Sequence, residues 1–346
     1  MIPIQNIYYM LSYAFQALSE QGYKDIATEK FDNAAELCAA ILIKGIAVQL
    51  KRGLGKEYIP KTETLANIRG KIEIGSSLKN QTFLRNQVVC TYEDFSINSY
   101  MNRILKATIE LLIRSYISKS LKKKLKRLMV YFSDVDAVDL QTINWSVRYD
   151  RNNQTYQMLI SICYLIVNGL LQTNTDGSIK LMDFFDEQRM CHLYEKFILE
   201  YYRKEHPEIN TNASQIPWQL DDDFNSMLPV MQTDIMLSSE NKVLIIDAKY
   251  YDHTTQLQYD KHILHSGNLY QIFTYVKNKA VELGDDHNVS GMLLYAKTDE
   301  AVQPDGTYSM SGNKISVRTL DLNCEFSVIK RQLDTIAGEY LGEVII

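Results

Sequence analysis

The stretch VLIIDAKYY, residues 243–251, decides how the second half of this 346-residue sequence folds. Four apolar residues lead into Asp247, Ala248 and Lys249, and two tyrosines follow. Because side chains alternate faces along a strand, Asp247 and Lys249 point to the same side. Two interpretations are open at this point: an ion pair that closes a buried strand, or part of a metal-dependent active site.

A second carboxylate lies on the preceding strand. The segment LPVMQTDIMLSS is typical of a strand and contains Asp234. A tight turn at residues 239–241 sets Asp234 opposite Asp247, since both lie equally far from the centre of the turn. Facing carboxylates repel one another unless a proton or a cation lies between them, and Mg²⁺ prefers oxygen-rich sites. The pattern predicts Mg²⁺ bound by both acids, with the Ala248 carbonyl as a further ligand.

Lys249 has a role in such a site. Its ammonium can orient a nucleophile beside a phosphate and stabilise the charge that develops there. A divalent metal polarises the phosphorus–oxygen bond, which is the usual basis of phosphodiester hydrolysis. Taken alone, the Asp-Ala-Lys sequence favours the ion pair, but the facing Asp234 shifts the balance toward the active site.

Two predicted helices carry further polar candidates. Glu195 lies in LYEKF between two apolar positions, and it is either a rim carboxylate or an additional ligand of the metal. Gln271 and Tyr275 are one turn apart in QIFTY, so they share a helix face. They could contact Lys249 or a phosphate, although surface polarity alone would explain them.

Candidate DNA contacts occur in both halves of the sequence. The run KSLKKKLKR, residues 119–127, predicts a basic helix face opposite a leucine stripe. Lys122 and Lys123 are its candidate phosphate contacts, but a solvated face is favoured, because charge runs usually solvate helices. Tyr251 shares the face of Lys249 and is a candidate for lining a DNA groove, whereas Tyr250 is predicted to pack on the opposite face.

The order of elements in the second half favours an α/β (α+β) fold with a mixed sheet flanked by helices. Helices are predicted at 188–206, at 267–283 and from about 324. Strands are predicted at 214–220, 228–239, 241–251, 289–297 and 314–322.

The first half is predicted to be mainly helical. Helices are expected near 7–19, 34–49 and 99–117 and from about 120. Between them, about residues 50–95, glycines punctuate short β-like pieces and indicate a small β-rich module. The expected domains are 1–150 and 151–346, with a soft boundary between 150 and 185.

Composition bounds the class of protein. Apolar residues make up 46% and charged residues 23%, as in soluble globular proteins. The net charge of −5 means that DNA binding would need a local basic patch or a partner. Five scattered cysteines argue for a reducing cytoplasm and against a zinc site. No apolar run is long enough to span a membrane. The sequence contains no GxxxxGK[ST] loop, so this chain is not expected to bind nucleotide itself.

The site residues resemble the PD-(D/E)xK nuclease superfamily. The matching positions are Asp234, Asp247, Ala248, Lys249, Glu195, Gln271 and Tyr275. The second acid is Asp where many members have Glu, and the first follows Thr233 where many have Pro. A closer resemblance, to the McrC family of McrBC restriction systems, spans essentially the whole chain. It is carried by the segments IPIQNIYYMLSYAF, KGIAVQLKRGL, IRGKIEI, MNRILKATI, LYEKF, TDIMLSS, KVLIIDAKYY and NLYQIFTYV.

The resemblance implies a partner as well as a reaction. McrC proteins cleave DNA with McrB, a GTP-dependent AAA+ motor that recognises methylated cytosine sites. Their N-terminal half inserts into the pore of a McrB hexamer and stimulates GTP hydrolysis. By this resemblance the β-rich module is a stalk, and Arg52, Arg69 and Lys71 are candidate contacts with the motor. Double-strand cleavage by a one-site nuclease requires two visits or two copies, so dimerisation of complexes is one expectation.

Two other functions are compatible with these residues. A stand-alone repair nuclease or exonuclease of the same superfamily would need no motor, but the long first half argues against it. A non-catalytic adaptor could dock on an AAA+ ring and activate it, with vestigial acids. The presence of Asp234, Asp247 and Lys249 together argues against the adaptor.

Overall fold

The computed structural model forms two compact units. It describes residues 2–19, 23, 26, 29–149, 154–176, 187–222, 227–258 and 261–342. Unit 1 joins Met1–Glu29 to Phe185–Ile346, and unit 2 is the intervening Lys30–Phe184. The break between Phe184 and Phe185 falls at the end of the expected soft boundary at 150–185, whereas the assignment of Met1–Glu29 to the same unit as the second half was not expected.

Helix α1 (Ile4–Ala14) belongs to unit 1 because its side chains bond to the second half of the chain. The Asn6 side-chain amide donates to the carbonyl oxygen of Leu322 at 2.9 Å, and the bond is buried. The Tyr13 hydroxyl donates to Glu205 at 2.7 Å. Since a buried polar group left without its partner is costly, α1 is fixed to unit 1 although the chain begins with it.

The core of unit 1 is a six-stranded mixed sheet with the order β12-β13-β11-β8-β7-β4. Strand β11 runs parallel to β8 and β13, and the remaining pairs are antiparallel. The strands are β4 (Asn210–Asn212), β7 (Ile235–Ser239), β8 (Lys242–Lys249), β11 (Asn288–Ala296), β12 (Gly306–Met310) and β13 (Asn313–Leu320). The expected mixed sheet is confirmed, and the short edge strands β4 and β12 add to the predicted set.

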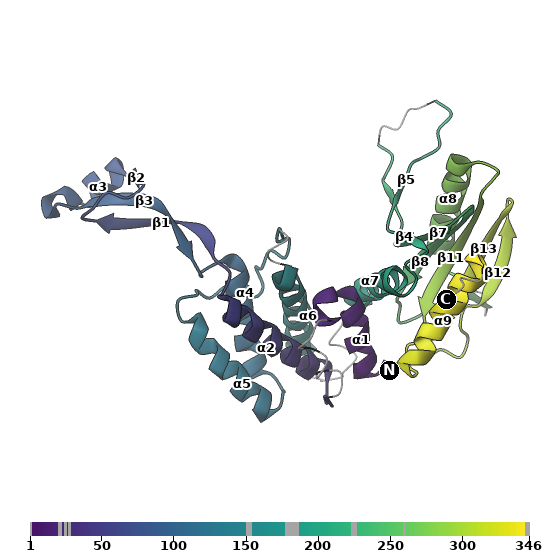
Figure 1. Ribbon diagram of the computed structural model, residues 1–346, viewed down its shortest axis with the longest axis horizontal. Helices are drawn as coiled ribbons and strands as arrows, with labels where there is room; N and C mark the ends of the chain where they lie inside the picture. The colour runs from purple at the N-terminus through teal and green to yellow at the C-terminus, as the bar shows by residue number, and fades with distance from the viewer. Residues whose placement is uncertain are drawn as a thin grey trace. The chain divides into compact units, whose positions relative to one another are not determined.

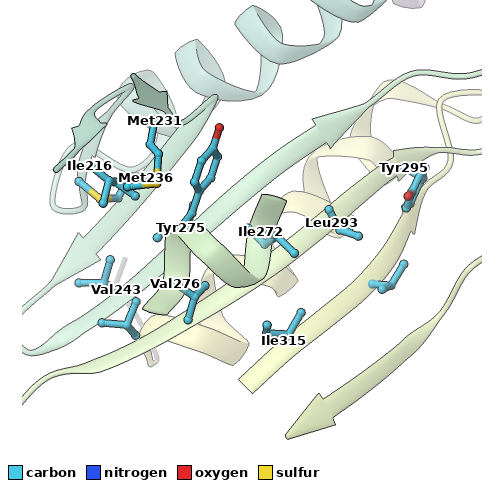
Figure 2. Packing of buried hydrophobic residues seen from close by; sticks show 13 residues of the cluster. Ile216, Met231, Met236, Val243, Ile272, Tyr275, Val276, Leu293, Tyr295 and Ile315 are labelled. Atoms are coloured by element: carbon cyan, nitrogen blue, oxygen red, sulfur yellow. The ribbon is translucent and has the colours of Figure 1, made fainter. Parts of the chain in front are cut away.

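Helices cover both faces of this sheet (Figure 1). They are α7 (Glu187–Glu205), α8 (Ser266–Leu283) and α9 (Phe326–Leu341). Positions 243–248 of β8 are all buried, so both faces of the strand are covered. A continuous apolar run is what the centre of a parallel sheet requires. On the α8 side, Val243 and Ile245 belong to one buried cluster with Ile272 and Val276 of the helix. Figure 2 labels Val243, Ile272 and Val276 of this cluster.

The predicted strand at 228–239 is divided in the structure. Strand β6 (Met231–Gln232) pairs with β5 (Gln215–Ile216), whereas β7 pairs with β8. The change of partner falls at Thr233, whose amide and hydroxyl both bond to the carbonyl oxygen of Ser214 at 3.0 Å. A further small sheet pairs β9 (Gln256–Gln258) with β10 (Lys261–Ile263).

Unit 2 is a helical body that carries a β-ribbon. Its helices are α2 (Ala34–Arg52), α3 (Ile74–Lys79), α4 (Tyr100–Arg114), α5 (Lys119–Met129) and α6 (Gln154–Asp176). Short 3₁₀ turns are η1 (Gln16–Ser19) in unit 1, and η3 (Thr82–Arg85) and η4 (Val130–Phe132) in unit 2. The side chains of Asn33 and Ser99 cap α2 and α4 by accepting from the amides of Glu36 and Asn102.

The ribbon confirms the predicted β-rich module. It consists of β1 (Glu57–Leu65), β3 (Val88–Ser96) and β2 (Lys71–Ile72), in the order β1-β3-β2, and it projects from α2 and α4 (Figure 1). We call residues 57–96 the ribbon. Gly70 turns the chain into β2 at φ +67°, where an added Cβ would lie 2.5 Å from the Thr91 carbonyl oxygen. Only glycine fits this turn.

A buried hydroxyl fixes the base of the ribbon to the helices. The amide of Gly55 donates to the Tyr156 hydroxyl, which donates to Oδ1 of Asn102, both at 2.8 Å. The Asn102 side-chain amide returns to the Gly55 carbonyl at 2.9 Å. This closed set of bonds satisfies the backbone just before β1, so the ribbon leaves the helical body in a defined direction.

Among the described residues, no helix combines the length and the apolar character that crossing a bilayer would require.

Candidate active site

Two carboxylates face each other at the end of the β7–β8 hairpin. The antiparallel register runs from Ser239 opposite Lys242 to Ile235 opposite Ile246, so the next pair is Asp234 opposite Asp247. Oδ2 of Asp234 accepts a hydrogen bond of 2.9 Å from the amide of Ala248. The structure therefore confirms the facing arrangement that the turn predicts.

Asp247 and Lys249 share a face of β8, as the strand period predicts. Lys249 Nζ lies 2.8 Å from Oδ2 of Asp247, and the Asp247 residue is only 1% exposed. Within the described part of the chain, neither carboxylate oxygen of Asp247 accepts a hydrogen bond of sound geometry. A buried carboxylate normally accepts several such bonds. Lys249 and the Asp234 carboxylate both lie within reach of Asp247, and its oxygens can also take a further ligand.

The electrostatics of the pair favour a bound cation. Burial and the neighbouring Asp247 and Glu195 carboxylates raise the pKa of Asp234 to about 8. Burial also raises the pKa of Asp247, although Lys249 opposes this rise. Burial alone would lower the pKa of Lys249, but the carboxylates of Asp247 and Asp234 raise it above its ordinary value. Lys249 is thus held protonated beside two acids that resist carrying full charge together.

The donor set fits a hard divalent ion. Asp234 and Asp247 supply carboxylate oxygens, the type of ligand that Mg²⁺ prefers while it retains waters and substrate oxygens. Across the described ranges, no group of three or more His, Cys, Asp or Glu side chains is arranged to hold a metal. The protein side chains therefore offer two carboxylates, and ligation by the Ala248 carbonyl stays a prediction.

Glu195 lies near the pair, but its own bonds are to helix α7. Its Oε1 accepts from Sγ of Cys191 at 3.0 Å, and Oε2 lies 3.3 Å from Nδ1 of His192. Burial and this hydrogen bond raise the pKa of Cys191 to about 12. The Glu195 charge raises the pKa of both aspartates. The structure thus brings Glu195 within electrostatic reach of them, and its ligation of a metal stays a prediction.

A hydrogen-bonded line connects Lys249 to helix α8. Lys249 Nζ donates to Oε1 of Gln271 at 3.4 Å, and Nε2 of Gln271 donates to the Tyr275 hydroxyl at 3.0 Å. The predicted contact of this helix with the lysine is confirmed. Tyr275 is 8% exposed and belongs to the core under α8 (Figure 2). Its hydroxyl accepts from Gln271 and so holds that side chain, and its predicted contact with a phosphate of DNA stays a prediction.

The tyrosines after Lys249 lie on different sides of the strand. The Tyr251 hydroxyl donates to Asn268 at 3.3 Å, and Asn268 donates to the buried Tyr295 hydroxyl at 3.0 Å. Tyr251 is half-buried, which leaves its predicted DNA contact as a prediction. The Tyr250 ring meets Tyr194 of α7 edge-on at 6.2 Å, in agreement with its predicted packing role.

Gly291 on β11 allows α8 to approach the site closely. A Cβ added there would lie 2.7 Å from Cγ2 of Val276 and 2.8 Å from Cγ1 of Ile272. Gly291 pairs with Ile245 on the strand that carries the catalytic candidates. A single glycine in a strand permits this close packing, but its presence in the sequence did not identify which helix would use it.

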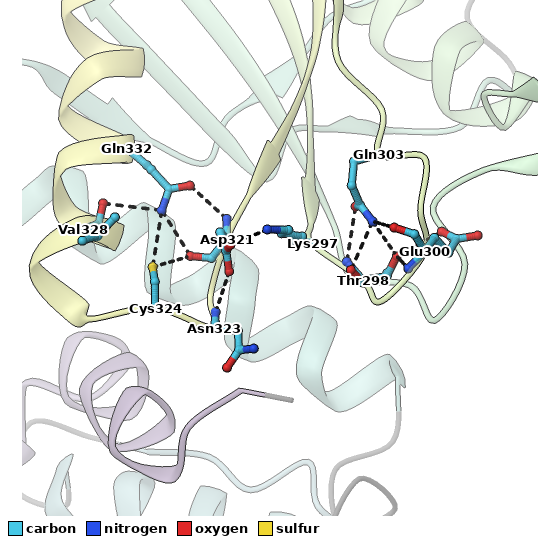
Figure 3. Close-up of polar contacts among 9 residues, drawn as sticks. All are labelled: Lys297, Thr298, Glu300, Gln303, Asp321, Asn323, Cys324, Val328 and Gln332. Carbon is cyan, nitrogen blue, oxygen red and sulfur yellow. Dashed lines mark hydrogen bonds and ion pairs between the residues drawn. The ribbon is translucent and has the colours of Figure 1, made fainter.

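Glu300 ties the segment after β8 to the loop after β11. Its Oε2 accepts from the amide and the hydroxyl of the fully buried Thr254, at 2.7 and 2.8 Å, and from Thr298 at 3.0 Å. Gln303 closes the same loop on Thr298 (Figure 3). The contact fixes the chain five residues past Lys249. No local pattern indicated it, because the two segments are far apart in sequence.

The remaining candidates lie in unit 2. Arg52 is the exposed last residue of α2. Arg69 lies over the Tyr92 ring, with 3.9 Å from Cζ to the ring centroid, and Lys71 pairs with Glu73 at 3.1 Å on the ribbon. Lys122 and Lys123 are on α5, where Lys123 is exposed opposite the buried Leu121 and Leu125, and Lys122 is half-buried beside them.

Comparison with known proteins places the chain in a family. The family model described as McrBC 5-methylcytosine restriction system component matches residues 5–296. The chain belongs to this McrBC family. It is also 31% identical over 346 residues to the type IV methyl-directed restriction enzyme EcoKMcrBC of Escherichia coli strain K12, covering 98% of both chains.

A solved structure shares the fold of this McrBC family member. It is a half-complex from a tetradecameric assembly of Thermococcus gammatolerans McrB AAA+ hexamers with bound McrC. The similarity has a TM-score of 0.50 at 17% sequence identity and covers 96% of this chain and 76% of the other. At this level of identity the comparison supports the fold.

Proposed function

We propose that this chain is the Mg²⁺-dependent DNA endonuclease subunit of a GTP-driven, McrBC-type restriction complex in the cytoplasm. It would hydrolyse phosphodiester bonds of DNA that carries 5-methylcytosine-type modifications. The observation that carries the proposal is the facing pair Asp234 and Asp247, with Lys249 on the same face. Membership of a restriction family supplies the biological setting.

The residues of the chain have separable roles in this reaction. Asp234 and Asp247 would hold Mg²⁺, which, when bound, supplies Lewis-acid polarisation of the scissile phosphate. Lys249 would keep its proton, orient the attacking water and stabilise charge on the phosphate oxygens. Gln271 accepts from Lys249 and thereby holds the ammonium at the carboxylate edge. Glu195 adds negative charge near the pair, which strengthens cation binding.

The partner we propose is a hexameric McrB-like AAA+ GTPase, whose GTP hydrolysis the chain stimulates. The solved structure that shares the fold is an assembly of McrB AAA+ hexamers with bound McrC. Support in this chain comes from the ribbon, which presents several large apolar side chains to solvent. The most exposed are Leu84, Tyr58, Ile68, Ile74 and Leu78. Exposed apolar surface on a projecting element is typical of a protein interface, and Arg52, Arg69 and Lys71 lie near it as candidate polar contacts.

A cleavage assay tests the proposal. The chain is mixed with a McrB-type GTPase, GTP, Mg²⁺ and methylated plasmid, and it is compared with Asp247→Ala. We expect the native mixture to linearise the plasmid and the variant to lose at least about 10³-fold in rate, since it removes a metal ligand and the partner of Lys249. Asp285→Ala, which removes an exposed carboxylate at the end of α8, is the matched control and should cleave normally.

Three other results of this assay would distinguish the alternative functions. Cleavage that survives Asp247→Ala would exclude the proposed site. Stimulated GTP hydrolysis without cleavage by the native chain would favour the non-catalytic adaptor. Cleavage by the chain alone, without GTPase or GTP, would favour a stand-alone nuclease.

A further inference from the structure

Helix α5 carries a concentrated positive charge that takes no part in the proposed nuclease centre. Lys119, Lys122, Lys123, Lys124, Lys126 and Arg127 lie on it, and it contains no acid. In the part of the chain that the structure describes, no carboxylate pairs with any of these six side chains. The whole chain is nevertheless acidic, with a net charge of −5. The helix is therefore a local basic surface on an acidic protein.

The charges are arranged along a shallow, open groove between the side chains on one face of the helix. Five of the basic residues and one apolar residue line a depression of about 590 Å³, namely Lys119, Lys122, Lys123, Lys126, Arg127 and Val130. These positions recur every three or four residues and so form one stripe along the helix. Lys124 lies outside the groove. The opposite face is buried in unit 2 through Leu121 and Leu125.

This charge pattern opposes the local stability of the helix. Like charges three or four residues apart repel, and Lys119 and Lys122 lie in the first turn, where the helix dipole favours acids. Other groups compensate at that end. Ser118 caps the helix by accepting from the Leu121 amide at 3.4 Å, and Glu36 of α2 accepts from the Ser118 amide at 2.7 Å. A bound anionic backbone would relieve the repulsion among these lysines and Arg127.

The dimensions and neighbours of the groove fit a nucleic-acid backbone. Lys119 and Arg127 are separated by about 12 Å along the helix axis, a distance over which duplex DNA presents about seven phosphates. Tyr116 and Tyr131 flank the stripe and are 83% and 58% exposed. Their hydroxyls are phosphate donors of the kind common in DNA complexes. Membrane binding would need an extended exposed apolar face, and Leu121 and Leu125 of α5 are buried.

We propose that the stripe Lys119, Lys122, Lys123, Lys126 and Arg127 binds the phosphate backbone of duplex DNA. The contact is independent of base sequence and lies on unit 2, outside the nuclease centre. It rests on the proposed function in so far as DNA is the substrate. It adds a second place where the chain holds that DNA.

Salt-dependent binding tests the proposal. The full chain is titrated against a short fluorescent duplex in EDTA, between about 50 and 200 mM salt, and anisotropy gives the affinity. We expect Lys122→Gln/Lys123→Gln to reduce the slope of log K against log salt by about two, about one for each lysine. At about 100 mM salt the affinity should fall by at least about tenfold. The melting temperature should stay the same or rise, because repelling pairs are removed.

A neighbouring lysine supplies the matched control. Lys124→Gln makes the same charge change as Lys123→Gln, one residue away but outside the groove. It should change the slope of log K against log salt by less than half as much as Lys123→Gln does. Equal losses for Lys123→Gln and Lys124→Gln would overturn the groove in favour of general charge. Three other results would also overturn it. The double variant could bind DNA with unchanged affinity, the native chain could fail to bind DNA at the lowest salt, or it could bind only to vesicles of anionic lipid. EDTA separates binding from cleavage. A chain that binds the duplex in EDTA but does not cut in the cleavage assay with Mg²⁺ would support the groove while excluding the nuclease.

Discussion

The carboxylate of Asp234 is bonded to the backbone amide of Ala248, which follows the opposing acid in the chain. This bond crosses the hairpin and fixes the Asp234 side chain toward the strand end that carries Asp247 and Lys249. The bond favours the charged form of Asp234, yet burial and the nearby carboxylates raise its pKa to about 8. The site is therefore built with a repulsion that a cation would relieve.

Replacing Asp234 with asparagine should stabilise the metal-free protein in a pH-dependent way. Because the pKa of Asp234 is raised on folding, the native state binds more protons than the unfolded state between about pH 4 and 8, and stability falls as pH rises through that window. Asp234→Asn removes this pH-dependent contribution to stability and retains an oxygen that accepts from the Ala248 amide. We expect its melting temperature in EDTA to exceed that of the native chain more at pH 8.5 than at pH 5. A larger gain at pH 5 would contradict the raised pKa.

Magnesium should stabilise the protein increasingly as pH rises. A metal binds deprotonated carboxylates, and a ligand that binds only the native state raises stability by mass action. Thermal melts with and without Mg²⁺ should therefore show a larger shift at pH 8.5 than at pH 5.5. Both Asp234→Asn and Asp247→Asn should abolish the shift, whereas Asp285→Asn should preserve it. A shift that persists in both site variants would place the ion elsewhere.

Gln271 should act through Lys249. We expect Gln271→Ala to slow cleavage by about tenfold, which is modest because the ammonium keeps its ion pair with Asp247. Lys249→Ala should cost about 10²–10³-fold, the scale of one lost electrostatic stabiliser. The double variant should then be no slower than Lys249→Ala, since the glutamine has nothing left to hold. Additive losses would show that Gln271 contacts the substrate independently.

The ribbon should be needed for GTPase stimulation and dispensable for folding. Leu84 is 82% exposed, so Leu84→Asp should leave the melting temperature of the free chain within about 1 °C, as surface changes usually do. It should nevertheless lower stimulation of a McrB-type GTPase by at least about tenfold, because a charge would enter an apolar contact. The matched variant is Lys79→Asp, a charge change at the end of α3, which should have the smaller effect. Full stimulation by Leu84→Asp would move the interface away from this side chain.

Gly291 should tolerate no side chain. A Cβ at this position would meet Val276 and Ile272 at less than 3 Å, so Gly291→Ala should destabilise the protein by about 1–3 kcal/mol in urea denaturation. Gly267, in the first turn of α8, has open space around its added Cβ. Gly267→Ala should be neutral or stabilising by up to about 1 kcal/mol. If both variants behave alike, the close approach of α8 to β11 is not a constraint.

The parts of the site that follow from strand periodicity were predictable. Asp247 and Lys249 share a face because the period of a strand is two, and a tight turn fixed Asp234 opposite Asp247. The Thr254–Glu300 contact depends on two loops that only the finished sheet brings together, so no local pattern indicated it. The edge strands β4 and β12 are short and polar, so their own sequences have little strand propensity. They form because they pair with β7 and β13.

Unit 1 is interrupted in sequence, and this has a consequence for how the protein is made. Its first helix leaves the ribosome before all of Lys30–Phe184, and its sheet only afterwards. At about 5–20 residues per second, synthesis of Lys30–Phe184 alone takes about eight to thirty seconds, and α1 waits at least this long for the strands it packs with. The ribbon-bearing unit can be complete during that interval. Under the proposed function, a nascent chain would therefore be able to meet a McrB-type motor before it acquires Asp234, Asp247 and Lys249.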